Sequence, residues 1–332
     1  MTAVPVAGKV VAFAAVCTIA LGAQEPPAAE KPKPGPPTIR LPLERLKPDS
    51  VIDIGGERVM AAGDAGVWVA SRAAGTVTRV EAKTNKVEVT VDVGKAPCAG
   101  MTAGFGSLLV PQCGAPALAR VDLKTHAVTT ITKGLTADLG APVTGVSSIW
   151  LLADKRGTLL RIDPVSNALV AEIPLGGVGQ ALAFGQSAIW IATAAGELLR
   201  LNPYTNVTEH TIRVGKSPRS IAIGEGSVWT LDAGDATVSR VDPKTNKVTT
   251  TIKLGGSISI ATGQIAVGEG SVWVSAPGAP LVRIDPRTNR VVQHFTGAGG
   301  GVILVAHGAL WLAATPTAIW RLDPKLVEAT RD

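Results

Sequence analysis

Aromatic and charged residues are scarce in this chain of 332 residues, and cysteine and histidine are scarcer still. Aromatic residues make up 4% and charged residues 17%, and the chain has three Cys and four His. Apolar residues still reach 46%, so the composition indicates a packed core rather than a disordered chain. The formal net charge is +6 without a run of basic residues, which indicates ordinary solvation of the surface rather than nucleic-acid binding.

Long apolar runs are absent after the N-terminus. Behind Lys9, the stretch from Val10 to Leu21 is almost unbroken in its apolar character and is followed by small residues up to Ala23. It is too short to span a bilayer comfortably, and it is typical of a signal peptide. We therefore expect residues 1–23 to be a cleaved signal, and the protein to be periplasmic or secreted, without stable membrane insertion after cleavage.

A proline-rich segment follows the expected signal. Residues 24–37 contain six prolines. This composition is typical of a stiff, extended spacer and not of a folded domain. We assign residues 24–49 to the spacer and residues 50–332 to one folded domain.

Internal repetition dominates the folded part. A Trp or Leu follows a Gly-rich turn in seven copies, and an Arg follows ten or eleven residues later. The first column comprises Trp68, Leu109, Trp150, Trp190, Trp229, Trp273 and Trp311, and the second comprises Arg79, Arg120, Arg161, Arg200, Arg240, Arg283 and Arg321. A period of about 40 residues with several short strands in each unit predicts an all-β, seven-bladed β-propeller.

Each copy predicts one blade of four antiparallel strands. In the fifth copy these strands are 220–223, 228–231, 237–241 and 247–254. The last copy has few residues left after its third strand, whereas residues 50–56 resemble the outer-strand ending near Gly255. We therefore predict that the N-terminal strand completes the last blade, which closes the ring and covers its strand edges.

Two of the three cysteines belong to one predicted hairpin. Cys98 and Cys113 are symmetric about the turn at Phe105 and Gly106. Opposed Cβ atoms in a sheet lie about 4.5–5.5 Å apart, so a small adjustment allows a disulfide. The alternative is two free buried thiols, and an oxidising compartment favours the bridge.

The repeat units resemble those of a known group of bacterial proteins. The segments GEGSVWTLDAGDATVSRVDPKTNKVTTTIKLG and GEGSVWVSAPGAPLVRIDPRTNRVV are similar to blades of the YncE-like (YVTN-type) propellers and of the related virginiamycin B lyase group, over residues 51–325. The resemblance implies the propeller fold and a group that mixes binding proteins, exported proteins and a few enzymes. The lyase blades carry a different signature after their Trp and are expected to use His and Glu with magnesium, so no catalytic residue is carried over.

Symmetry within the chain separates structural positions from functional ones. A residue type found in most copies serves the fold, whereas a polar residue found in one or two copies is a functional candidate. Propeller ligands usually bind at the mouth formed by the loops into the innermost strands and the loops joining the second and third strands. At the start of the innermost strand the copies have Arg58, Ala99, Gly140, Gln180, Arg219, Gly263 and Gly301.

These positions and their neighbouring loops define a candidate mouth site. Its residues are Arg58, Arg72, Asp154, Arg156, Gln180, Arg219, Asp232 and Gln264. Arg58 and Arg219 offer two guanidinium groups that can hold a carboxylate or phosphate through paired hydrogen bonds, which predicts an anion-preferring pocket. The alternative is a solvated rim with a few internal ion pairs.

Histidine-based catalysis is not expected. His126 and His307 fall in turns on the face opposite the mouth, and His210 and His294 fall on outermost strands. No histidines are placed to share a metal ion, and the chain has no Ser-centred elbow, metal-spaced Cys pair or phosphate loop.

The leading hypothesis is an exported, monomeric binding module without a cofactor or metal, which takes a protein partner or a small anionic ligand on its mouth face. The first alternative is a virginiamycin B lyase-like or lactone-hydrolysing enzyme that uses mouth carboxylates and a divalent ion. The second is a structural envelope protein held by the spacer. Nucleic-acid binding is the least favoured reading.

Overall fold

The computed structural model describes residues 1–2, 38–56, 58–94, 97, 100–112, 115–136, 139–153, 157–255, 260 and 262–331. The chain divides into two units, Met1–Gly35 and Pro36–Asp332. All described helices and strands belong to the second unit.

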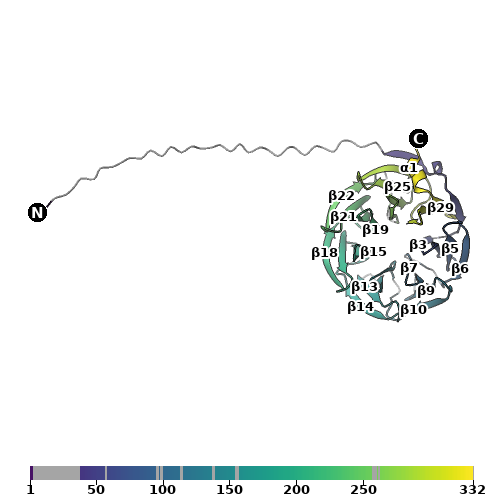
Figure 1. Ribbon diagram of the computed structural model, residues 1–332, viewed down its shortest axis with the longest axis horizontal. Helices are drawn as coiled ribbons and strands as arrows, with labels where there is room; N and C mark the ends of the chain where they lie inside the picture. Colours follow the sequence, from purple (N-terminus) through teal and green to yellow (C-terminus); the bar gives the residue numbers. More distant parts are fainter. Residues whose placement is uncertain are drawn as a thin grey trace. The chain divides into compact units, whose positions relative to one another are not determined.

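Seven sheets of the second unit form a ring around a central channel, and each sheet is one blade of at least four antiparallel strands (Figure 1). The innermost strands β3, β7, β15 and β19 lie near the channel, and the last strands of the blades lie at the outer edge of the ring (Figure 1). The predicted seven-bladed, all-β fold is confirmed.

The first four blades follow one another in sequence. Their strands are β3 (Arg58–Ala62), β4 (Gly66–Ser71), β5 (Thr76–Glu81) and β6 (Val87–Asp92); β7 (Thr102–Gly104), β8 (Ser107–Pro111), β9 (Leu118–Asp122) and β10 (Val128–Ile131); β11 (Val143–Gly145), β12 (Ser148–Ala153), β13 (Thr158–Ile162) and β14 (Leu169–Pro174); and β15 (Gly179–Gly185), β16 (Ala188–Thr193), β17 (Glu197–Asn202) and β18 (Val207–Arg213).

The last three blades include the two strands that precede the first blade in sequence. Their strands are β19 (Pro218–Gly224), β20 (Ser227–Asp232), β21 (Thr237–Asp242) and β22 (Lys247–Lys253) in blade 5; β23 (Gln264–Gly268), β24 (Ser271–Ala276), β25 (Ala279–Asp285), β26 (Arg290–Thr296) and β1 (Ile39–Pro42) in blade 6; and β27 (Ile303–Ala306), β28 (Ala309–Leu312), β29 (Ala318–Leu322) and β2 (Ser50–Asp53) in blade 7.

The ring closes through β2, as the sequence predicts. Residues 50–53 pair antiparallel with β29, so the strand that comes before blade 1 completes blade 7. Closure removes the free edge that an unfinished last blade would present to other chains.

Three further elements near the termini were not expected. Strand β1 pairs in parallel with β26 and gives blade 6 a fifth strand, and the short 3₁₀ helix η1 (Leu43–Arg45) follows it. The part of the expected spacer between residues 39 and 45 is therefore folded, and its buried side chains Leu41 and Leu43 explain why. Helix α1 (Pro324–Ala329) follows β29, and no helix of the described residues has the length and apolarity that a bilayer crossing requires.

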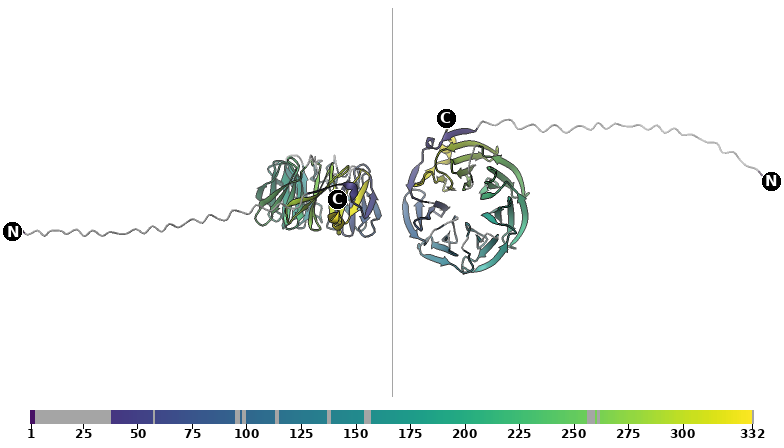
Figure 2. Two further views of the ribbon diagram at one scale, coloured as in Figure 1. Left: turned by 90° about the horizontal axis from the view of Figure 1, so that it is seen from above. Right: turned by 180° about the vertical axis from the view of Figure 1, so that it is seen from behind.

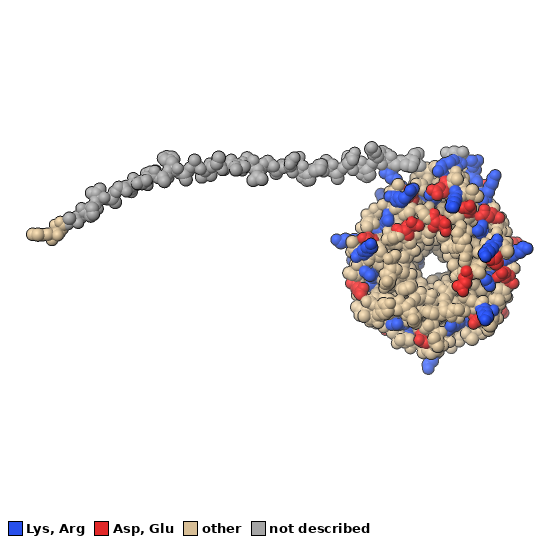
Figure 3. Space-filling view, viewed as in Figure 1, with Lys and Arg blue, Asp and Glu red and all other residues tan. Residues whose placement is uncertain are grey.

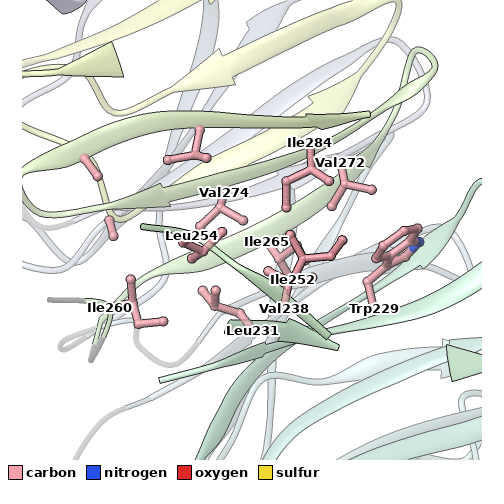
Figure 4. Packing of buried hydrophobic residues seen from close by; sticks show 13 residues of the cluster. Trp229, Leu231, Val238, Ile252, Leu254, Ile260, Ile265, Val272, Val274 and Ile284 are labelled. Carbon is pink, nitrogen blue, oxygen red and sulfur yellow. The ribbon is translucent and has the colours of Figure 1, made fainter. Parts of the chain in front are cut away.

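The core lies between neighbouring blades. Figure 4 shows the cluster between blades 5 and 6, where Val238 and Ile252 of one blade face Val272 and Ile284 of the next. Side chains that alternate across each strand bury one face of a blade against the following blade, so the ring is a chain of sheet-on-sheet contacts. The Trp column lies in this core, and Trp229 is fully buried.

The two faces of the ring are defined by their connections. We call the face with the loops into the innermost strands, and with the loops between second and third strands, the mouth face. The opposite face, which we call the turn face, carries the tight turns between strands one and two and between strands three and four. Helix α1 follows the third strand of blade 7, in the place of such a turn, and therefore marks the turn face (Figure 1). The right-hand view of Figure 2 shows the same ring from behind.

Candidate functional site

Two of the predicted mouth residues lie at β-bulges. The pairing between β15 and β16 skips Gln180, and the pairing between β19 and β20 skips Arg219. A bulge leaves its extra residue outside the ladder and turns the side chain away from the regular alternation. Arg219 is consequently exposed at the rim of blade 5, and Gln180 is half-buried.

Other predicted residues are placed only in part. Arg58 begins β3 and pairs with Ser71 through the backbone, but its side chain lies outside the described part of the structure. Arg72 is exposed directly after β4. Asp154 and Arg156 lie outside the described residues. Because the Arg58 side chain is not described either, its joint action with Arg219 on one ligand stays a prediction.

A pocket of about 390 Å³ opens on the mouth face between blades 6, 7 and 1. It is formed by loops into innermost strands and by the loop between β28 and β29, which are the connections that the sequence assigns to the mouth. Its lining consists of Gly56, Thr262, Gln264, Gly299, Gly300, Gly301, Val302, Ala313, Thr315 and Pro316. Gln264 is the one residue of the predicted site in this lining.

Gln264 links two blades and leaves a donor at the pocket. Its Oε1 accepts a hydrogen bond from the backbone N–H of Ile303, at 3.2 Å, which fixes the amide between blades 6 and 7. Because a side-chain amide carries two further N–H groups, its Nε2 can donate to a ligand. No hydrogen bond from this Nε2 occurs within the described part of the chain.

Three consecutive glycines form one wall of this pocket. Gly299, Gly300 and Gly301 have φ angles of 89°, 92° and 104°, a conformation that favours glycine. A Cβ on Gly300 would come within 2.4 Å of the carbonyl oxygen of Ala276, so a side chain does not fit there. The glycine run at 297–301 is a sequence signal of this wall, of which the mouth column included only Gly301.

Asp232 is a buried carboxyl group next to the mouth. It has no exposed surface, and it accepts hydrogen bonds from the hydroxyl groups of Thr230, Thr237 and Ser239 at 2.7, 3.3 and 2.6 Å. Burial raises its pKa from 3.8 to about 6, although the bonds from Ser239 and Thr230 act in the opposite direction. Asp232 is therefore an internal polar group rather than part of an exposed ion pair.

The backbone of Gly215 separates Asp232 from a second mouth pocket. A Cβ on Gly215 would lie 2.6 Å from a carboxylate oxygen of Asp232. Gly215, Arg213 and Lys216 belong to the lining of this pocket, which has a volume of about 370 Å³. Two cationic side chains thus gather at the rim between blades 4 and 5, close to Arg219 in the sequence.

The histidines lie where the sequence places them. His126 and His307 occupy turns with φ angles of 60° and 53°, and His210 and His294 belong to β18 and β26. His294 is buried beneath β1, and this burial lowers its pKa. Within the described residues, no three His, Cys, Asp or Glu side chains gather as metal ligands do.

The predicted disulfide lies outside the described residues, because neither Cys98 nor Cys113 is among them. The strands around it are informative. Near the turn, Thr102 pairs with Leu109, whereas further out Pro97 pairs with Gln112. The register thus shifts by two residues along this hairpin, so the simple symmetry about the turn does not extend to its base.

No protein-family model and no curated protein sequence matches this chain. Solved structures do match it. A streptogramin B lyase structure and the virginiamycin B lyase from Staphylococcus aureus each superpose with a TM-score of 0.69 at 15% sequence identity; both cover 82% of this chain, which spans 96% and 97% of theirs.

A third similar structure is the WD40 domain of Pan2 from Neurospora crassa, with a TM-score of 0.65 and 14% identity, over 82% of this chain and 90% of that one. Identities this low show a shared β-propeller fold and carry no activity over to this chain.

Proposed function

We propose that this chain is a binding protein that holds a small, uncharged polar ligand in the mouth pocket beside Gln264. The observation that carries the proposal is the position of this pocket, at the meeting point of three blades on the face where the sequence predicts the site. Concave sites with mostly apolar walls and a few placed polar groups are the usual form of small-molecule sites.

The chemistry of the lining argues for an uncharged ligand. Val302, Ala313 and Pro316 offer apolar contact, and the described lining contains no charged side chain. The polar contribution comes from Gln264, from threonine hydroxyl groups and from the glycine backbone. The anion preference expected from Arg58 and Arg219 has no support in this lining. Binding of an anion is therefore the alternative result of the screen described next.

A thermal-shift screen with two variants separates these ligands. Neutral compounds with amide, hydroxyl or lactone groups are compared with carboxylates and phosphates, because a ligand that binds only the folded state raises the Tm. We expect a neutral compound to raise the Tm of the parent, to lose its effect in Gln264→Ala and to keep it in the double variant Arg58→Ala/Arg219→Ala. A carboxylate or phosphate that raises the Tm and loses this effect only in the double variant would show an anion site instead. A neutral compound that keeps its effect in both variants would reject the pocket.

A second candidate function is a lyase- or hydrolase-like activity, which Asp232 favours. Its carboxyl group keeps a proton up to about pH 6 and lies directly behind the rim pocket at Gly215, so it has the protonation behaviour of a general acid. The fold similarity to two lyases agrees with this candidate without adding a residue to it. Turnover of a cyclic ester that needs added Mg²⁺ and disappears in Asp232→Asn would support the enzyme; the absence of turnover would leave the binding protein.

Export is part of the proposed function. A signal peptide over residues 1–23 would direct the chain to the periplasm or outside the cell, and the oxidising conditions there would favour a Cys98–Cys113 bridge. Mass spectrometry of the protein recovered from outside the cytoplasm tests both, since the intact mass gives the new N-terminus and thiol alkylation before and after reduction counts bridged cysteines. A full-length chain confined to the cytoplasm with alkylatable thiols would contradict export.

A further inference from the structure

Strand β1 gives blade 6 an outer strand that the repeat does not contain. Among the described strands, blade 6 alone forms a sheet of five, and β1 lies at its outer edge, where Figure 1 shows it in purple. It pairs in parallel with β26, in a register that sets Arg40 beside His294 and Leu41 beside Phe295. Because side chains alternate along a strand, Leu41 packs with Phe295 on one face of the sheet, and Arg40 lies on the other face with His294.

His294 occupies a position that is exposed in the six other blades. The position is the outer-strand residue that pairs with the residue before the column arginine, as His294 pairs with Val282. His294 is only 3% exposed, whereas its counterparts are exposed, and blade 6 differs from the other blades by the presence of β1. The counterparts are Val51, Thr90, Thr130, Glu172, Thr211 and Thr251. We attribute the burial of His294 to the strand that covers it.

The surroundings of the His294 ring suit its neutral form. Its Nδ1 is buried and has no hydrogen-bond partner in the described part of the chain. Arg40 faces the ring from β1 and Val282 faces it from β25, while the charged residues of the adjacent β22, Lys247 and Lys253, are both cations. None of these groups would stabilise a proton on the ring. Burial and, to a smaller extent, the charge of Arg40 lower the pKa of His294 below its usual value of 6.5.

The side chain of Arg40 extends from β1 toward blade 5. Its Nη2 lies 3.6 Å from the place that a Cβ on Gly255 would take, at the end of the loop that follows β22. Figure 3 shows further Lys and Arg side chains at this edge of the ring. A proton on His294 would therefore add a positive charge beside a guanidinium group in a cationic neighbourhood.

Protonation of His294 and attachment of β1 oppose each other. With β1 in place, the ring resists a proton. With β1 detached, the ring would be as exposed as its counterparts and would titrate near 6.5. Below that pH the detached form binds more protons than the attached form, so a falling pH shifts the equilibrium toward detachment. Well above it His294 is neutral in both forms, and the pH has no effect.

We propose that β1 is an acid-released strap, which covers the edge of blade 6 at neutral pH and leaves it when His294 takes up a proton. Release would uncover the backbone N–H and C=O groups of β26 and one side of Phe295. Such an edge can pair with a strand of another chain, so the strap would expose an association surface only in acid. The strap lies at the outer edge of the ring and is independent of the proposed function of the mouth.

Hydrogen–deuterium exchange of the whole chain at about pH 7.5 and about pH 5 tests the strap. Protection factors, which correct for the pH dependence of the exchange chemistry, are compared for Ile39–Pro42 and for Ser50–Asp53 of β2. Both segments are outer strands, but β2 covers no histidine. We expect protection of β1 to fall by about tenfold in acid and that of β2 by less than about twofold. Equal protection of β1 at both pH values would overturn the proposal.

Matched variants assign the effect to one ring. His294→Gln stays uncharged, so the loss of β1 protection in acid should disappear. His294→Thr, the residue of four other blades at this position, is measured in parallel, so that a variant that does not hold β1 at neutral pH does not decide the test. Arg40→Gln should move the release to lower pH, because the ring no longer faces a cation. His210→Gln is the control, since His210 is exposed in β18. Release in acid that persists in both His294 variants would refute the strap.

Discussion

Nη1 of Arg240 lies 2.8 Å from Oδ1 of Asn289, although the two residues belong to neighbouring blades. The same guanidinium lies over the ring of Trp229, 4.9 Å from its centroid, and donates through Nε to Ser227 at 2.9 Å. One side chain thus links its own blade to the next. The Trp and Arg columns are structural, as the sequence predicts, because they face each other across the second and third strands.

Asn289→Gly should destabilise the protein by about 1–2 kcal/mol, because the Arg240 guanidinium loses a partly buried acceptor. Glycine keeps the left-handed backbone, since Asn289 has a φ of 56°. Asn85→Gly is the matched control, with a φ of 60° and no arginine bond to lose. Urea unfolding measures both, and equal losses would show that the bond contributes nothing.

Ala188→Ser should stabilise the protein by about 0.5–1 kcal/mol. In four blades a serine hydroxyl accepts from Nε of the column arginine, as Ser227 does from Arg240 at 2.9 Å. Blade 4 has Ala188 at this position, and Nε of Arg200 is buried without a partner. Differential scanning calorimetry should show a higher Tm for the variant, and a lower Tm would mean that the added hydroxyl does not reach Arg200.

Asp232 should make stability fall as the pH rises from about 4 to 6. Burial raises its pKa from 3.8 to about 6, so the folded protein binds a proton there that the unfolded chain has lost. Asp232→Asn removes this titration. Between pH 4 and pH 7 the unfolding free energy of the variant should rise relative to the parent by up to about 3 kcal/mol. A difference that does not change with pH would contradict the buried, protonated state.

Leu41→Ala should cost about 2–3 kcal/mol, although residue 41 precedes the repeats. Leu41 is 5% exposed in β1, where it packs with Phe295 and Leu281 of blade 6. Val51→Ala is the control, because Val51 is 58% exposed in β2. Thermal unfolding compares the two variants, and an unaffected Leu41→Ala would show that β1 adds nothing to the fold.

Periodic features of the fold could be predicted from the sequence. The observed strands of blade 5 match the predicted ones to within two residues at each end, because alternating side chains recur in most copies and the Asp-Pro-x-Thr-Asn turn, complete in blades 5 and 6, recurs with substitutions in the others. The closing strand could be found by its likeness to the other outer strands. Strand β1 could not, since the segment Ile39–Pro42 has no counterpart in the repeat.

The candidate site was harder to predict. Gln264 lies in the mouth pocket as predicted. The pocket walls, however, depend on the path of the loop that contains Gly299, Gly300 and Gly301, and the alternation of polar and apolar residues does not specify that path. The distance from the marker Trp places Gln180 and Arg219 at the start of their innermost strands. The β-bulges at these two residues change the direction of their side chains, which that distance does not predict. The polar surroundings of Asp232 were open to prediction, because Thr230 and Ser239 stand where most other copies have apolar residues.

Crystals soaked with neutral fragments that carry a hydrogen-bond acceptor give the sharpest check of the ligand site beside Gln264. We expect fragment density in the mouth pocket of blades 6, 7 and 1, with the acceptor within hydrogen-bond distance of Nε2 of Gln264, and no such density in Gln264→Ala crystals. Fragments that bind elsewhere on the mouth face while this pocket stays empty would contradict it.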